Sequence, residues 1–147
     1  MNGVLVVELV PKTSFYNNVR SSVSKEDWDI LRKQAYKNAG HCCSVCKKKA
    51  RLEAHEIWHY DDKKNIQKLA EIKALCHDCH MVYHLGFASV NGEYNKTFKH
   101  LQKLNGWSKE ETTMYVDAVF EVWFWRSKKN WEVDLSLLDS LGISYKK

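Results

Sequence analysis

The chain has 147 residues, of which 44% are hydrophobic and 28% charged, and its formal net charge is +5 at pH 7. This composition excludes a mainly disordered or collagen-like chain, and the length suits a single domain spanning residues 1–147. No apolar run approaches the length that crosses a bilayer, and the first residues do not resemble a charged leader. We therefore expect a cytoplasmic protein with no membrane partner.

The first 39 residues predict a strand followed by a helix. Residues 4–10 are rich in β-branched side chains and end at Pro11, which favours a short strand. Ser24 is a typical N-cap, apolar residues then recur at helical spacing, and Gly40 is a typical helix stop. We expect this helix to lead directly into the first cysteine pair.

Two C-x-x-C pairs predict a zinc site. Each pair lets two sulfurs converge on one ion, and two pairs complete a tetrahedron, so zinc is the natural occupant. The alternatives are disulfides or buried free thiols, which the absence of a leader disfavours. The ligands would be Cys43, Cys46, Cys76 and Cys79. Cys42 would be a spare thiol, because pairing it with Cys46 would lengthen the gap.

The segment between the two pairs is long enough for a β-hairpin. Residues 51–60 alternate in the manner of a strand, and Asp61-Asp62 is typical of a turn. A helix should begin near Cys76 and run to about Gly86. We therefore expect a hairpin followed by a helix, with the zinc site joining them.

The C-terminal part, residues 87–147, predicts a helical extension. One helix should span residues 94–105, and Ser108 with Glu111 forms a capping box for a longer one. That longer helix is apolar around most of its circumference, so we expect it to be buried on several sides or to support a homodimer.

Residues 40–86 resemble the zinc-stapled branch of the HNH endonucleases, including bacterial and phage proteins. The resemblance rests on Cys43-x-x-Cys46, then Leu52-Glu53-Ala54-His55-Glu56-Ile57, then Leu75-Cys76-x-x-Cys79-His80-x-x-x-His84. It implies an α+β, mainly helical fold around a ββα-metal core, in which a hairpin packs on a helix. It also implies that His55, His80 and His84 hold a catalytic divalent metal, Mg²⁺ or Mn²⁺/Ni²⁺. The alternative is that His80 or His84 belongs to the zinc site.

The general base departs from the family pattern. The family places a second histidine after the metal-binding one, whereas this chain has Glu56 there. His59 is the alternative, because residues 55, 57 and 59 of a regular strand share a face. Motif register favours Glu56 and strand geometry favours His59. We take Glu56 as base or extra metal ligand, with His59 as the substitute.

The resemblance implies a metal-dependent endonuclease that hydrolyses phosphodiester bonds in DNA, with nucleic acid as partner, and the sequence alone leaves the choice between DNA and RNA open. Basic clusters at 47–51, 63–64 and 128–129 could meet phosphates. The alternative is a catalytically degenerate HNH-fold binding protein, a phage or mobile-element factor acting on a nucleic-acid or host-defence partner. The missing second histidine supports that alternative.

Overall fold

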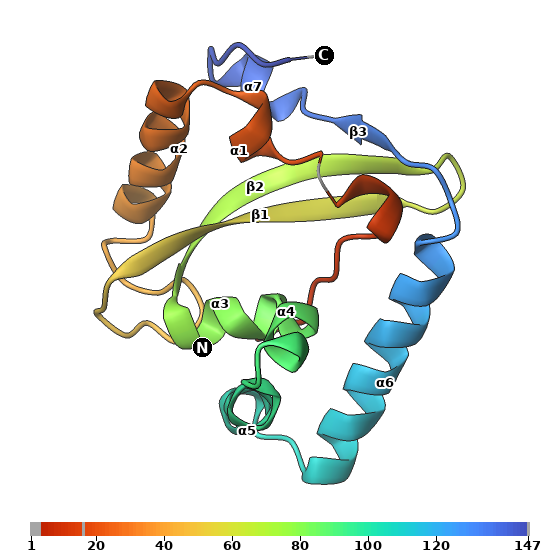
Figure 1. Ribbon diagram of the computed structural model, residues 1–147. Coiled ribbons are helices and arrows are strands. Elements are labelled where there is room, and N and C mark those ends of the chain that lie inside the picture. Colours follow the sequence, from red (N-terminus) through yellow and green to blue (C-terminus); the bar gives the residue numbers. More distant parts are fainter. Residues whose placement is uncertain (1–3, 16, 147) are drawn as a thin grey trace.

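The computed structural model describes residues 4–15 and 17–146. The first three residues, on which the expectation about a leader was based, lie outside the described residues. The described chain is an α+β protein with a three-stranded sheet and seven α-helices (Figure 1). In chain order the elements are η1 (Lys12–Ser14), α1 (Val19–Ser22), α2 (Lys25–Asn38), β1 (Leu52–Asp61), β2 (Ile66–Cys76), α3 (His77–Tyr83), α4 (Leu85–Val90), α5 (Tyr94–Asn105), α6 (Lys109–Arg126), β3 (Glu132–Asp134) and α7 (Leu137–Ser140).

The predicted hairpin is confirmed. Strands β1 and β2 pair antiparallel over their whole length, from Leu52 opposite Cys76 to Asp61 opposite Ile66. The pairing carries a bulge beside Ile57. The short strand β3 pairs parallel to β2, although residues 87–147 were expected to be helical. A strand of three residues is too short to show the alternation of apolar and polar side chains from which a strand is predicted.

The hairpin separates two hydrophobic clusters. On one face, α1, α2 and α7 cover a cluster that includes Trp58 and Leu69 of the hairpin (Figure 1). On the other face, α3, α4, α5 and α6 enclose a cluster that contains Leu75, Val82 and Leu101. Ile57 of β1 packs against this second cluster and Trp58 belongs to the first, with the bulge between them.

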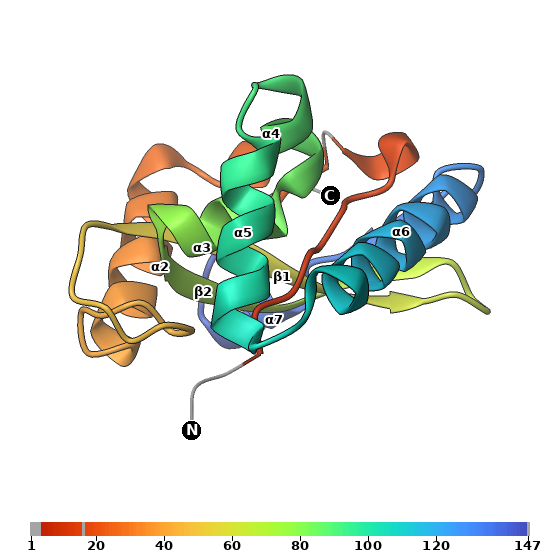
Figure 2. The same ribbon diagram turned by 90° about the horizontal axis from the view of Figure 1, so that it is seen from below.

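Residues 4–10 do not form the predicted strand. Leu5 donates to Asn105 Oδ1 (2.8 Å) and accepts from Asn105 Nδ2 (2.7 Å), while the Val7 amide donates to Tyr115 Oη (3.0 Å). These side-chain partners replace the backbone of a neighbouring strand. Figure 2 shows the extended segment running between α5 and α6. The β-branched composition is explained by burial between helices rather than by a sheet.

The helix boundaries follow the predicted caps, with one departure. Ser24 caps α2, and Ser108 forms the capping box of α6. Gly106 ends α5 in the left-handed conformation (φ 65°), which a glycine adopts without strain. The helix expected from Cys76 to Gly86 is interrupted, since α3 ends at Tyr83 and His84 takes a non-helical conformation before α4.

Helix α6 is much more exposed than its composition predicted. Among its residues, all within the described part of the chain, Thr112 and Val116 are the buried ones. Met114 is 73% and Phe124 58% exposed, with the Lys128 ammonium 4.5 Å from the Phe124 ring centre. The expectation of burial on several sides was wrong, because no described element covers the outer face. The homodimer stays a prediction.

Within residues 4–15 and 17–146, none of the helices combines the length and apolar character needed to traverse a bilayer.

We predict that Asn105→Ala lowers the free energy of unfolding by about 1–3 kcal/mol, because both polar backbone groups of Leu5 lose their partners. Chemical denaturation measures the change. Asn95→Ala, at an exposed position of the same helix, is the matched control and should change stability by less than about 0.5 kcal/mol. Equal effects of the two substitutions would contradict this account of the N-terminal segment.

Candidate metal centres at the hairpin–helix junction

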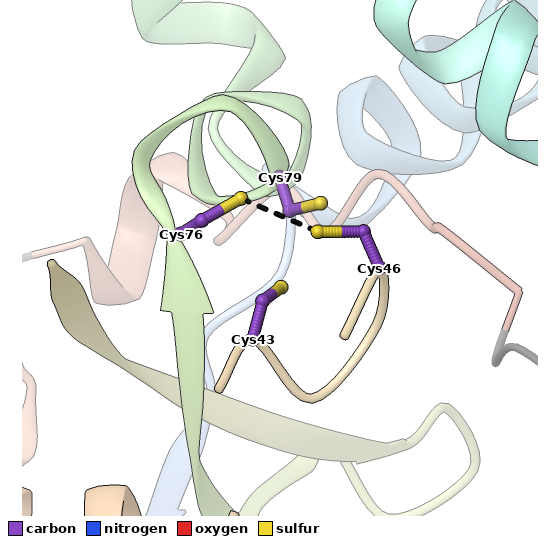
Figure 3. Close-up of side chains that lie close together, drawn as sticks. All are labelled: Cys43, Cys46, Cys76 and Cys79. Atoms are coloured by element: carbon purple, nitrogen blue, oxygen red, sulfur yellow. Dashed lines mark hydrogen bonds between the residues drawn. The ribbon is translucent and has the colours of Figure 1, made fainter. Parts of the chain in front are cut away.

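The four predicted cysteine ligands come together where the hairpin meets α3. Cys43 and Cys46 lie in the loop before β1, Cys76 ends β2 and precedes α3, and Cys79 lies in α3. Their sulfur atoms all lie within 4.8 Å of one another, and the side chains point toward a common centre (Figure 3). The amide of Ser44 donates to the carbonyl of Ala74 (2.9 Å), which attaches the loop to β2.

The sulfur spacing suits a tetrahedral zinc ion. Cys46 Sγ and Cys76 Sγ are 3.7 Å apart. Four sulfurs about 2.3 Å from one ion would be about 3.8 Å apart. Cys42 lies outside the group, as expected, although it is adjacent to Cys43. The cluster is therefore a site that could hold a metal such as zinc.

The protonation of the thiols also favours a cation. A hydrogen bond with Cys79 lowers the pKa of Cys43, and the same contact raises the pKa of Cys79. Without an ion, one thiolate therefore suppresses ionisation of its neighbour, whereas a divalent ion stabilises all of the thiolates together.

His100 also lies beside the cysteine cluster, with its Nε2 atom 3.3 Å from Cys79 Sγ. The sequence did not reveal this contact, because His100 comes from the remote helix α5.

The three predicted histidines form a second cluster. His55 projects from β1 and is only 4% exposed. His80 lies in α3, and His84 is the first residue after this helix. His84 Nε2 is 3.1 Å from His55 Nδ1 and 3.0 Å from His80 Nε2. A ring nitrogen carries either one proton or one lone pair, so it cannot hydrogen-bond well to both neighbours. A shared cation explains the convergence better.

The distances and protonation of this cluster fit a metal ion. Nitrogens about 2.1 Å from one ion and about 90° apart would be about 3.0 Å from each other. Burial lowers the pKa of His55 to about 2, with His84 and His80 contributing, and burial with His80 lowers that of His84 to about 4. Both rings are therefore neutral at pH 7, the form that binds a metal. The cluster is separate from the cysteine group.

Two acidic residues that the sequence analysis did not select also lie at the histidine cluster. Glu53 Oε1 is 2.7 Å from His80 Nδ1, and Glu53 Oε2 is 3.2 Å from His77 Nδ1. Partial burial raises the pKa of Glu53, but the contacts with both histidines outweigh it and lower the pKa. Strand alternation could have found Glu53, since it precedes His55 by two residues on one face.

The second acidic residue is Glu8, from the extended N-terminal segment. Its Oε1 lies 4.0 Å from His55 Nε2 and accepts the amide proton of Trp58 (3.0 Å). Burial raises the pKa of Glu8 to about 7, although the hydrogen bond from Trp58 opposes this. Glu8 is the single charged residue in the apolar run 4–10, which is unusual, but nothing in the sequence linked this residue to the histidine motif.

Neither base candidate joins the histidine cluster. Glu56 projects to the opposite face of the hairpin, where its Oε1 accepts the amide proton of Val19 (2.9 Å) at the start of α1. Burial raises the pKa of Glu56, and the hydrogen bond from Val19 opposes the rise. His59 is exposed and lies four residues along the strand from His55, about 13 Å away.

The chain matches no protein-family model, no curated protein and no solved structure. The resemblance to HNH endonucleases therefore rests on the motif residues alone.

We predict that Cys76→Ser lowers zinc content from one ion per chain to near zero and the melting temperature by more than 10 °C. Zinc bound to such a site contributes directly to folding, and several kcal/mol corresponds to a shift of this size in a chain of about 150 residues. Elemental analysis and thermal unfolding measure the two effects. Cys42→Ser is the matched control, because this thiol lies outside the cluster. Zinc-free folded wild-type protein would contradict the assignment.

Proposed function

We propose that this protein is a metal-dependent endonuclease of the HNH type that hydrolyses phosphodiester bonds in DNA. The observation that carries the proposal is the convergence of three imidazoles, those of His55, His80 and His84, beside a separate four-cysteine site. In this proposal β1, β2 and α3 are the ββα-metal core, and zinc joins the loop before β1 to the start of α3.

The residues fit the proposed catalytic metal. The imidazoles suit Mn²⁺ or Ni²⁺ better than Mg²⁺, which prefers oxygen ligands. A divalent metal at this position supplies charge neutralisation for the phosphate and for the leaving oxygen. His55 would bind the metal from β1, His80 from α3, and His84 from the position just after α3, so the packing of the hairpin on this helix sets the distances between the ligands.

The surface beside the histidine cluster supports a polyanionic substrate. A groove of about 220 Å³ lies between α3 and α5, and its lining includes His77, the lysines Lys96, Lys99 and Lys103, and the carboxylates Asp78 and Glu93, so that lysines outnumber carboxylates. His77 contacts Glu53, which contacts His80, so this groove borders the metal site. Lysines along such a groove can contact successive phosphates and add salt-dependent affinity.

A second function is favoured by one observation. Glu56 occupies the motif position of the family's base, yet its carboxylate binds the backbone of α1 on the opposite face of the hairpin. A chain without a base at that position could act as an HNH-fold binding protein that retains the metal sites and holds a nucleic acid or a host-defence protein. Cleavage assays separate the two functions.

We predict that wild-type protein nicks supercoiled plasmid with Mn²⁺, Ni²⁺ or Mg²⁺, and that His84→Ala lowers the rate by about 10³-fold, the equivalent of several kcal/mol of metal stabilisation. Zinc content and fold should be unchanged. His41→Asn, an exposed histidine with φ 60° that asparagine tolerates, is the control. Metal-dependent plasmid binding without nicking would favour the binding protein, and loss of zinc in His84→Ala would place that histidine in the cysteine site.

The placement of Glu56 predicts a structural effect for its removal. Glu56→Ala should lower the free energy of unfolding by about 1–3 kcal/mol, because the Val19 amide loses its acceptor, and should leave the nicking rate within a few-fold. Denaturation and nicking assays below the melting temperature measure the two effects. A loss of about 10²-fold or more in rate, with stability unchanged, would restore Glu56 as the general base.

A further inference from the structure

Glu8 is held rigidly beside the histidine cluster. The Glu8 amide donates to the carbonyl of Tyr83 at the end of α3 (3.1 Å), and its Oε1 accepts from the Trp58 amide of β1 (3.0 Å). The residue therefore bridges the strand and the helix that carry the proposed metal ligands. Its side chain is only 13% exposed, which is unusual for a carboxylate.

His55 needs an acceptor at the position that Glu8 occupies. Its Nδ1 points to the cluster, 3.1 Å from His84 Nε2. A neutral imidazole that binds a metal through Nδ1 must carry its proton on Nε2. His55 Nε2 is buried and has no hydrogen-bond partner among the described residues, and the Glu8 Oε1 lies 4.0 Å away. A movement of about 1 Å would bring the two atoms to hydrogen-bond distance.

We propose that Glu8 is a positioning residue of the metal centre, whose carboxylate accepts the Nε2 proton of His55 and so presents Nδ1 to the metal. The inference rests on the proposed function and deepens it. The arrangement mirrors the contact on the other side of the cluster, where Glu53 meets His80 Nδ1 and leaves His80 Nε2 for the metal. Carboxylates that hold the second nitrogen of a ligating histidine orient the ring and increase metal affinity.

The N-terminal segment is thereby part of the site. It comes from more than 40 residues before His55 and lies outside the stretch 40–86 that carries the HNH motif. An apolar residue at position 8 would continue the packing of its neighbours and avoid the cost of burying a carboxylate. The presence of a carboxylate at position 8 is thus explained by its position beside the imidazole ring of His55.

Two variants test the role of Glu8. Glu8→Met keeps a similar volume and removes the acceptor, whereas Glu8→Gln keeps an acceptor oxygen. Calorimetric titration with Mn²⁺, which competes poorly for thiolates, measures affinity at the histidine cluster in zinc-loaded protein. Long-range ¹H–¹⁵N spectra of the same protein without Mn²⁺ report which nitrogen of His55 carries the proton. Glu110→Gln, an exposed carboxylate of α6, is the charge control.

We expect Glu8→Met to weaken Mn²⁺ binding by about 10–100-fold and to abolish the preference of His55 for the Nε2 proton. Glu8→Gln should retain that preference and most of the affinity, and Glu110→Gln should match wild type. An unchanged His55 spectrum in Glu8→Met would overturn the inference. If wild type binds no Mn²⁺, the proposed function fails, while the His55 spectrum still decides whether Glu8 positions the ring.

Discussion

The structure depends on the convergence of four cysteine sulfurs at the junction of the hairpin and α3. The loop before β1 has little regular structure of its own, and the helix that follows β2 is short. Short helices and irregular loops are marginal without tertiary constraints. A zinc ion at the cysteines would fix both to one point, and it would thereby fix the start of the helix that carries His80 and ends just before His84.

The histidine cluster, by contrast, is built at a cost in stability. Burial raises the pKa of Glu8 from 4.5 to about 7, which corresponds to about 3 kcal/mol against its ionised form. His55 is buried beside two other imidazoles, which lowers its pKa further. Buried ionisable groups that perturb one another are typical of functional sites. A chain selected for stability alone would place apolar side chains at these positions.

The sequence predicted the parts of this site that local spacing determines. Two C-x-x-C pairs and an alternating strand are short-range patterns, and the hairpin and the four-cysteine cluster follow them. The clustering of His55 with His80 and His84 followed from the motif. Glu8 could not be assigned, because its contact with His55 depends on how a segment 47 residues away packs.

The same limit explains the errors in the flanking regions. Residues 4–10 have the composition of a strand, but their partners are Asn105 and Tyr115, about 100 residues later. The apolar surface of α6 predicted burial, yet composition cannot tell how many elements remain to cover a helix. Within the motif region, Glu56 lies on the opposite face of the hairpin from the histidine cluster and His59 is exposed further along β1, so the identity of the general base stays a prediction.

We propose that one short junction holds two different metals in two separate sites. Crystals grown with zinc and soaked in Mn²⁺, with anomalous diffraction recorded at both absorption edges, distinguish two sites from one. We expect a zinc peak among the four Sγ atoms and a manganese peak between His55 Nδ1, His80 Nε2 and His84 Nε2. A single peak shared by cysteine and histidine ligands, or no manganese at the histidines, would contradict it.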